Sequence, residues 1–322
     1  MVRTKNLMFG AISYSPIIVI RAREPDVEAR LIAESKAFRM QVEAFNPDYI
    51  VMFSNDHYAN FHYANTSAFC IGTACKAVDD VGGTPGKVPV LEEEAMALIS
   101  FVRREGFDPA ISYRMRVDHG FSQPLNRLLG GVDRFPLIPV FTSAFTPPLI
   151  SFYRSRMFGE AVGRFIAQSG KRVLILGSGG LSHHQAHYYP LRADADPAVY
   201  GWQLDGEAGG TMTAEQWFRR LYTMHVQGTD AIVAGTRTVA DMRLNEAFDR
   251  EVLEYIASGN LAPMDGWDHM DILATAGVGA LEIHNWISAR AAFSAAGGAA
   301  VTAAYDLVPD YAVGYALAQS AP

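Results

Sequence analysis

The chain has 322 residues, of which 49% are hydrophobic and 19% charged, and its formal net charge is -7 at pH 7. This length allows one large domain with a substantial buried core, while the acidic balance and scattered cations argue against a nucleic-acid binder or a polybasic membrane-surface protein. No stretch approaches a membrane-spanning helix, and Cys70 and Cys75 fit reduced thiols, so we expect a cytoplasmic protein.

In chain order, the first half alternates apolar strand runs with amphipathic helices. The helix expected over 24–45 carries an apolar stripe that includes Ile32. Strands alternating with helices predict an α/β fold with a central, mostly parallel or mixed sheet, helices on both faces, and an active site at the strand carboxyl ends. The strands are expected at 7–13, 49–53, 110–115, 137–141 and 172–176, and the helices at 24–45, 90–105, 123–129 and 151–168.

The alternation stops after about residue 190. Asp, Ala and Gly are frequent from Asp194 to Gly210, which predicts a loop or excursion. Helical periodicity returns at 213–225, 245–258 and 279–295, and a strand is expected within 300–314. No repeat or linker interrupts the chain, so we expect one domain over residues 1–322.

Three of the expected strands are each followed by a histidine: His57, His119 and His183. Each alone could equally be a structural loop histidine, but ligands gather at strand carboxyl ends in α/β sheets, so their convergence favours a functional site. The glycine-rich turn before His183 lacks a P-loop lysine and a dinucleotide-binding spacing, which argues against phosphate binding. Asp118 need not pair with His119, because adjacent side chains of an extended segment point to opposite sides.

Glu282 is the carboxylate that could complete a metal site with histidines. It is flanked by Leu281, Ile283 and Trp286. A carboxylate in such surroundings is either buried with a partner or placed at a helix start, near the positive end of the helix dipole. His284, two residues further on, faces elsewhere on the helix.

With these motifs the chain resembles the class III extradiol ring-cleaving dioxygenases, the protocatechuate 4,5-dioxygenase β-subunit superfamily, and among them the 2,3-dihydroxyphenylpropionate 1,2-dioxygenases. The likeness covers most of the chain, and residues 190–240 form a divergent insertion or loop region. The segments that carry the resemblance are Ser15-Pro16, Phe53-Ser54-Asn55-Asp56-His57-Tyr58, Val117-Asp118-His119-Gly120, Leu128-Leu129-Gly130-Gly131, Arg156-Met157-Phe158-Gly159 and Arg172 to His183.

The resemblance implies an iron enzyme of aromatic-compound degradation that cleaves a catechol-like or related phenolic substrate with O2. His57 and Glu282 would be ligands of Fe(II), and His119 and His183 would be the acid/base pair. The resemblance also implies a homo-oligomer. For the substrate's side chain, Arg114, Arg116 and Arg156 are candidate partners of a carboxylate, and each is equally readable as a surface arginine.

Tyr14 is the departure from the family pattern, which has a metal-binding histidine at this position. The tyrosine could ligate as a tyrosinate, a hard donor suited to Fe(III), or another histidine (His62, His184 or His187) could replace it. Alternatively the metal is lost and Tyr14 acts in proton transfer. The leading hypothesis is an extradiol dioxygenase; the alternatives are a metal-independent lyase, hydrolase or isomerase using Tyr14 and the histidines, and a non-catalytic small-molecule-binding homologue.

Overall fold

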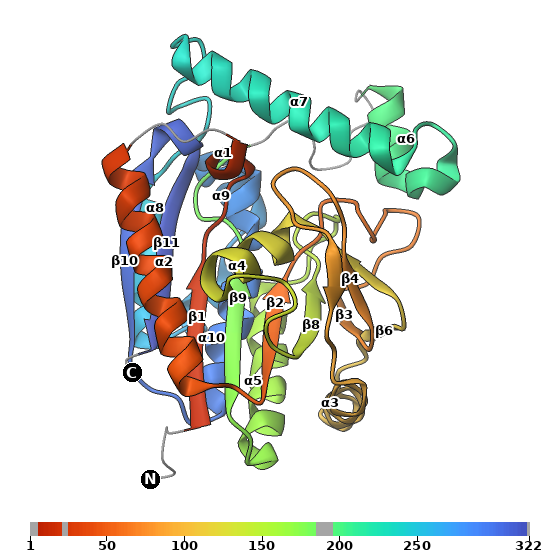
Figure 1. Ribbon diagram of the computed structural model, residues 1–322, viewed down its shortest axis with the longest axis vertical. Helices are drawn as coiled ribbons and strands as arrows, with labels where there is room; N and C mark the ends of the chain where they lie inside the picture. The colour runs from red at the N-terminus through yellow and green to blue at the C-terminus, as the bar shows by residue number, and fades with distance from the viewer. Residues whose placement is uncertain (1–5, 21–24, 185–195, 321–322) are drawn as a thin grey trace.

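An eight-stranded mixed sheet forms the centre of the protein (Figure 1). The structure is a computed structural model and describes residues 6–20, 25–184 and 196–320. Four adjacent strands are parallel (β1, β9, β2 and β8), while β11 and β3 run antiparallel to their neighbours β1 and β8. Across the sheet the order is β10 (Val301–Val308), β11 (Val313–Ser320), β1 (Leu7–Ile12), β9 (Val173–Ser178), β2 (Tyr49–Ser54), β8 (Leu137–Thr142), β3 (Phe69–Gly72) and β6 (Ala110–Ser112).

A smaller sheet of three strands lies beside the main sheet. It consists of β5 (Gly86–Val88), β4 (Cys75–Ala77) and β7 (Met115–Val117). Its strand β7 pairs in parallel with β4, which brings the loop between β4 and β5 next to the chain that follows β7. This arrangement places the segment around Asp80 beside His119.

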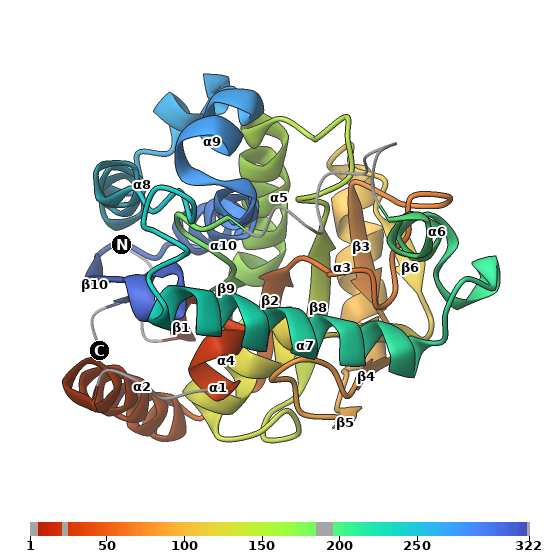
Figure 2. The same ribbon diagram turned by 90° about the horizontal axis from the view of Figure 1, so that it is seen from above.

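Helices cover both faces of the main sheet, as the sequence predicts (Figure 2). On one face α5 (Phe152–Ser169) packs against α10 (Ile283–Ala295), and on the other α2 (Pro25–Phe45) packs against α4 (His119–Leu129). The helix α7 (Ala214–Val233) crosses above the strand ends. The remaining helices are α1 (Pro16–Ile20), α3 (Glu92–Arg104), α6 (Pro197–Asp205), α8 (Glu246–Ser258), α9 (His269–Ala276) and the 3-10 turns η2 (Gly206–Gly209), η3 (Ala262–Gly266), η4 (Val278–Glu282) and η5 (Pro309–Tyr311).

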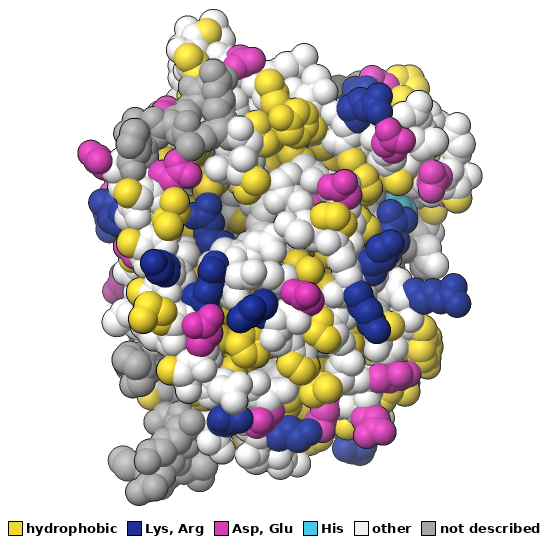
Figure 3. All heavy atoms as spheres, viewed as in Figure 1, with side chains coloured by type: hydrophobic (Ala, Val, Ile, Leu, Met, Phe, Trp, Pro, Cys, Tyr) yellow, Lys and Arg dark blue, Asp and Glu magenta, His cyan; other side chains and the backbone are white. Residues whose placement is uncertain are grey.

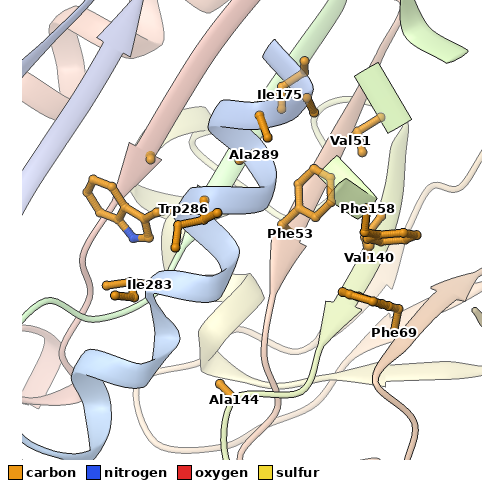
Figure 4. Close-up of a cluster of buried hydrophobic side chains, with 14 of the residues drawn as sticks. Val51, Phe53, Phe69, Val140, Ala144, Phe158, Ile175, Ile283, Trp286 and Ala289 are labelled. Carbon is orange, nitrogen blue, oxygen red and sulfur yellow. The ribbon is translucent and has the colours of Figure 1, made fainter. Parts of the chain in front are cut away.

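The central strands are buried on both faces, which explains their continuous apolar sequences. In β2, Val51 and Phe53 belong to the core on the α5/α10 face, whereas Ile50 and Met52 belong to the core on the α2/α4 face. Figure 4 shows the first of these cores, in which Trp286 of α10 and Phe158 of α5 are drawn with the strand side chains. The sheet is therefore a rigid platform for residues at its strand ends.

The helices α5 and α10 approach each other at backbone distance. A Cβ added at Gly159 would lie 2.2 Å from the carbonyl oxygen of Ser288, and one at Gly163 would lie 2.2 Å from that of Ala292. The Ser288 hydroxyl donates to the Ser155 carbonyl at 3.0 Å. Because neither glycine tolerates a side chain here, α10 has one fixed position on α5.

Several expected elements differ from the observed ones. The single strand expected at 110–115 is two strands in two sheets, β6 and β7, because Tyr113 and Arg114 form a turn between them. The strand expected within 300–314 is a hairpin of β10 and β11, since residues 309–311 form a 3-10 turn. Ile32 does not belong to the buried stripe of α2: it is 50% exposed.

The loop expected from Asp194 to Gly210 is also wrong in its described part, because α6 occupies residues 197–205. The Asp196 side chain caps this helix by accepting from the Ala198 amide, and Pro197 starts it. Trp202 then stacks on Trp217 of α7, with ring centroids 5.4 Å apart, which stabilises the helix through tertiary packing. Strands β3, β4 and β5 were not predicted at all.

Two global features agree with the sequence. Both cysteines are free thiols in the core, and burial raises the pKa of Cys70 and of Cys75 to about 12. Within the described residues, no helix combines the length and apolar character needed to cross a membrane.

Candidate active site

A small, partly enclosed cavity lies at the strand ends, beneath α7. Its volume is about 30 Å³, close to the space that one water molecule occupies. The cavity unites all five residues that the sequence nominated with side chains from the covering helix. Its lining comprises Tyr14, Ser15, Pro16, His57, His119, His183, Leu221, His225, Val278, Glu282 and Ala312.

Three donor atoms form a nearly equilateral triangle in the wall of this cavity. The Tyr14 hydroxyl lies 3.1 Å from His57 Nε2 and donates a hydrogen bond to Glu282 Oε1 at 3.2 Å. His57 Nε2 and Glu282 Oε1 are 3.3 Å apart. The three residues come from the ends of β1, β2 and η4, so the fold brings together chain segments that are far apart in the sequence.

Glu282 is the last residue of η4 and directly precedes α10, which agrees with the helix-start alternative. Its Oε2 accepts a hydrogen bond of 2.5 Å from the Gly180 amide, and Asn55 Nδ2 donates to its Oε1 at 3.4 Å. Gly179 adopts φ +139°, and a Cβ there would lie 2.6 Å from Glu282 Cβ. The glycine-rich turn is thus required for the close approach of the backbone to this carboxylate.

His57 is oriented by Asp118. Asp118 Oδ2 accepts from the His57 amide at 2.5 Å and lies 3.1 Å from His57 Nδ1. A proton on Nδ1 leaves Nε2 directed at Tyr14 and Glu282. Burial opposes a charge on His57, but Asp118 and Glu282 together hold its pKa well above the usual range, and His57 in turn holds the pKa of both carboxyls below theirs.

His119 is the first residue of α4, and its partner is Asp80, not the adjacent Asp118. Asp80 Oδ2 lies 2.5 Å from His119 Nδ1 and accepts from the His119 amide at 3.1 Å. The His119 ring also stacks on His57 with centroids 4.1 Å apart. The strand before His119 is β7 of the small sheet, so the expectation that all three histidines follow strands of one sheet holds for His57 and His183 only.

Among the described residues, no carboxylate pairs with His183 Nδ1. This nitrogen lies 3.0 Å from the Leu181 carbonyl oxygen, so it is the nitrogen that carries the proton in the neutral ring. Burial lowers the pKa of His183, although Glu282 opposes the shift. The neighbouring Ser182 is fixed by Asp249, which accepts from its amide and from its hydroxyl at 2.6 Å each.

Sequence reasoning missed two residues of the site, Asp80 and His225. Asp80 comes from a loop that no motif connects with His119. His225 lies on α7 in a buried row at every fourth residue (Trp217, Leu221, His225 and Thr229), and a histidine within such an apolar stripe is a signal that could have been used. Burial lowers the pKa of His225 to about 3, so its imidazole is neutral at neutral pH.

His62 and His184, two of the histidines that could have replaced a metal ligand, are not in the cavity lining. His62 packs edge-on against Trp202 with centroids 5.7 Å apart, and the His184 ring lies beside the Val278 amide. His187 falls outside the described residues. Arg156 is paired with Asp265 and Glu160, and His284 faces Ser155 and His269, as a structural residue would.

The triangle fits a metal ion in its geometry. Two ligands at a right angle on a metal with bonds of about 2.1 Å lie about 3 Å apart, close to the three observed separations. The donor set differs from two histidines and one carboxylate, because the third atom is a phenol oxygen. Two buried carboxyls, Asp118 and Glu282, surround one imidazole, and either a proton on His57 or a bound cation can balance their charge. His57, Asp118 and His119 also place ligand atoms within 4.8 Å of one another.

The comparisons with known proteins agree on one family. The family model described as the catalytic LigB subunit of aromatic ring-opening dioxygenase matches residues 9–317. The 2,3-dihydroxyphenylpropionate/2,3-dihydroxicinnamic acid 1,2-dioxygenase of Burkholderia vietnamiensis is 36% identical over 304 residues, 94% of this chain and 93% of the relative. The corresponding enzyme of Escherichia coli K12 is 36% identical over 286 residues, 89% of each chain.

Proposed function

This chain belongs to the LigB family of aromatic ring-opening dioxygenases, and from that membership we propose that it cleaves a catechol-like aromatic diol with O2 by the extradiol route. One observation carries the proposal: the Tyr14, His57 and Glu282 donor atoms lie within 3.3 Å of one another, and His119 and His183 line the same cavity. The relatives act on dihydroxyphenylpropionate and dihydroxicinnamic acid, which supports a phenolic substrate here.

In the proposed reaction His57 and Glu282 would hold Fe(II), with the Tyr14 hydroxyl as the third donor. The bound ion would supply electron transfer between the diol and O2. His183 is suited to accept a proton from a substrate hydroxyl, because its imidazole is neutral and its Nε2 is the unprotonated nitrogen. His119, backed by Asp80, is suited to hold a proton and return it. Leu221, Val278 and Ala312 supply apolar walls that exclude water.

A volume of about 30 Å³ is smaller than an aromatic substrate needs. Leu221 and His225 of α7 line one side of the cavity. We propose that an outward movement of α7 makes room for the ring and that its return encloses the reactants. The cytoplasmic location and the homo-oligomer implied by the family resemblance remain predictions.

The test is metal analysis of protein purified without oxygen, combined with oxygen uptake in the presence of an aromatic diol. We expect near-stoichiometric iron, oxygen consumption and a yellow ring-fission product. The matched variants are Tyr14→Phe, which removes the third donor atom, and Tyr14→His, which supplies an imidazole. We expect less bound iron in Tyr14→Phe and full retention in Tyr14→His.

A second function has one observation in its favour. The Tyr14 hydroxyl already donates to Glu282, so the triangle can be satisfied by its own hydrogen bonds. In that case Tyr14 and the histidines would serve a metal-independent lyase, hydrolase or isomerase by acid/base catalysis. Metal-free protein that turns over an aromatic or ring-cleaved compound without sensitivity to chelators would establish this function and refute iron-dependent cleavage.

A further inference from the structure

A second, larger hollow lies on the other side of Tyr14 from the histidine cavity. This groove runs between α1, α2 and α4 and has a volume of about 820 Å³, within the range of small-molecule pockets. Tyr14 and Ser15 line both spaces. Its other walls come mainly from α2 and from the part of α4 beyond His119, and the reaction proposed above uses none of those side chains.

The floor of the groove contains buried polar groups whose hydrogen-bonding capacity is not fully used. The hydroxyls of Ser35 and Tyr315 have no partner in good hydrogen-bond geometry among the described residues, although the two residues are only 4% and 2% exposed. Burial raises the pKa of Tyr315, and the charge of Arg127 and weak hydrogen bonds with Ser35 and Arg127 partly oppose that rise, so the three side chains face one another. Buried polar atoms in native proteins are nearly always paired, so this cluster indicates a missing ligand group.

Two guanidinium groups share this floor. Arg39 Nε and Arg127 Nη1 are buried and make no hydrogen bond to any described residue. Arg39 uses its Nη2 to cap the carboxyl end of α4, donating to the carbonyls of Asn126 and Arg127 at 2.9 and 2.8 Å. No described carboxylate forms an ion pair with either arginine, and Figure 3 shows Lys and Arg side chains gathered over α2 and α4. The missing group is therefore an anion, for which arginine provides paired donors.

Part of the rim of the groove is apolar, although Lys36 and Glu43 also line the groove. Val19 of α1 and Ile32 and Met40 of α2 line it and are 57%, 50% and 63% exposed. An inorganic anion alone would leave these side chains in water. A ligand with an apolar body and one anionic end would cover them and satisfy the floor at the same time.

We propose that the groove between α1, α2 and α4 binds a small amphipathic carboxylate. The carboxylate would lie among Arg127, Arg39 and the hydroxyls of Ser35 and Tyr315, and the apolar body would lie along Val19, Ile32 and Met40. This site is separate from the catalytic cavity and does not depend on a bound metal.

The test measures equilibrium binding of octanoate to the full chain, stripped of metal, by isothermal titration calorimetry. Octanamide serves as the neutral analogue of octanoate, and inorganic phosphate serves as an anion without an apolar body. We expect one saturable site for octanoate and at least about tenfold weaker binding of octanamide, because a charged hydrogen-bond partner is lost. Because no metal and no turnover are involved, failure here is distinguishable from failure of the proposed dioxygenase function.

Three variants locate the site. Arg127→Gln should weaken octanoate binding about tenfold, and Tyr315→Phe should weaken it by a smaller factor. Tyr315→Phe removes only the buried hydroxyl beside Ser35 and Arg127, so it tests the groove with little change in side-chain volume. The control is Arg134→Gln, whose arginine pairs with Glu43 at 4.0 Å, and it should bind octanoate as the wild type does.

Equal binding of octanoate and octanamide would overturn the proposal, as would wild-type binding by Arg127→Gln. Binding of phosphate without octanoate would mean an adventitious ion only and would also overturn it. A melting temperature for each variant shows whether it folds. If Arg127→Gln fails to fold, Tyr315→Phe alone decides, and unchanged affinity in that variant counts against the site.

Discussion

The histidine cavity and the α1/α2/α4 groove are both lined by Tyr14, but they differ in open volume and in how far their polar groups are paired. In the cavity, His57 and His119 each have a carboxylate partner and the space left over is about 30 Å³. In the groove, about 820 Å³ is open, and two buried hydroxyls and one nitrogen each of Arg39 and Arg127 have no well-formed hydrogen bond to a described residue. The comparison indicates that the cavity is pre-organised to act on what it encloses, whereas the groove becomes complete only when a ligand arrives.

The largest effect should come from removing the two histidines that we propose as the acid/base pair. We expect His119→Ala and His183→Ala each to lower kcat by about 10²–10⁴-fold, since a positioned proton-transfer group contributes that much. The measurement is steady-state oxygen uptake, with circular dichroism as the check on folding. His62→Ala, which lies against Trp202 outside the cavity, is the control and should retain activity. Wild-type rates in either histidine variant would contradict both enzymatic functions.

Removing the partner of His119 should cost less than removing His119 itself. Asp80→Asn keeps the shape of the side chain but no longer fixes the Nδ1 proton, so we expect kcat to fall about 10–100-fold with KM nearly unchanged. A merely structural Asp80 would instead change the melting temperature and leave the pH profile of kcat where it was. Asp80→Glu should recover part of the rate if the carboxylate positions the ring.

The contribution of Asp249, which holds Ser182 beside His183, to the free energy of unfolding should depend on pH. Burial raises the pKa of Asp249 from 3.8 to about 6, although its hydrogen bonds from Ser182 and Tyr305 oppose the shift. The folded state therefore holds this proton more tightly than the unfolded state, so the group stabilises the fold fully below pH 3.8 and this contribution is lost as the pH rises to about 6.

Asp249→Asn tests this dependence. The variant should lack this part of the pH slope because its side chain does not titrate, and its neutral amide should match the protonated carboxyl most closely at low pH. Urea unfolding at pH 4 and pH 7 measures the difference in slope. Parallel slopes for the variant and the wild type would show that Asp249 does not titrate as described.

The smallest effect belongs to the groove rim. Ile32→Gln should change the free energy of unfolding by no more than about 0.5 kcal/mol, because the side chain is half exposed and packs on little. The same change should measurably weaken octanoate binding. A large loss of stability would mean that the rim belongs to the core, and the contrast between the two regions would disappear.

The sequence predicted the catalytic cavity better than it predicted the groove. His57, His183 and Glu282 were found because strand ends and a helix start are visible as local patterns, and the structure brings them together. Asp80 and His225 were missed because their positions depend on how β4 pairs with β7 and how α7 crosses the sheet. Such long-range pairings leave no spacing in the sequence.

The same limit explains the errors in the fold. Ile32 was assigned to the buried stripe of α2 by periodicity, but the structure places it on the rim of an open groove. Among arginines, Arg156 was a candidate for binding a carboxylate and is in fact paired with Asp265 and Glu160. The sequence did not predict a binding role for Arg39 and Arg127, because the absence of an ion-pair partner can be recognised only when the surroundings of the guanidinium are known.

The glycines of α5 make the catalytic chemistry vulnerable at a distance. Gly159 and Gly163 let α10 rest directly on the backbone of α5, and Glu282 is the residue from which α10 departs. A methyl group at either glycine would push the whole of α10 along or away from the sheet, and Glu282 would move with it. A substitution at Gly159 or Gly163 would therefore lower activity although neither residue contacts the substrate. A survey of natural variants that covered only the cavity lining would overlook such substitutions.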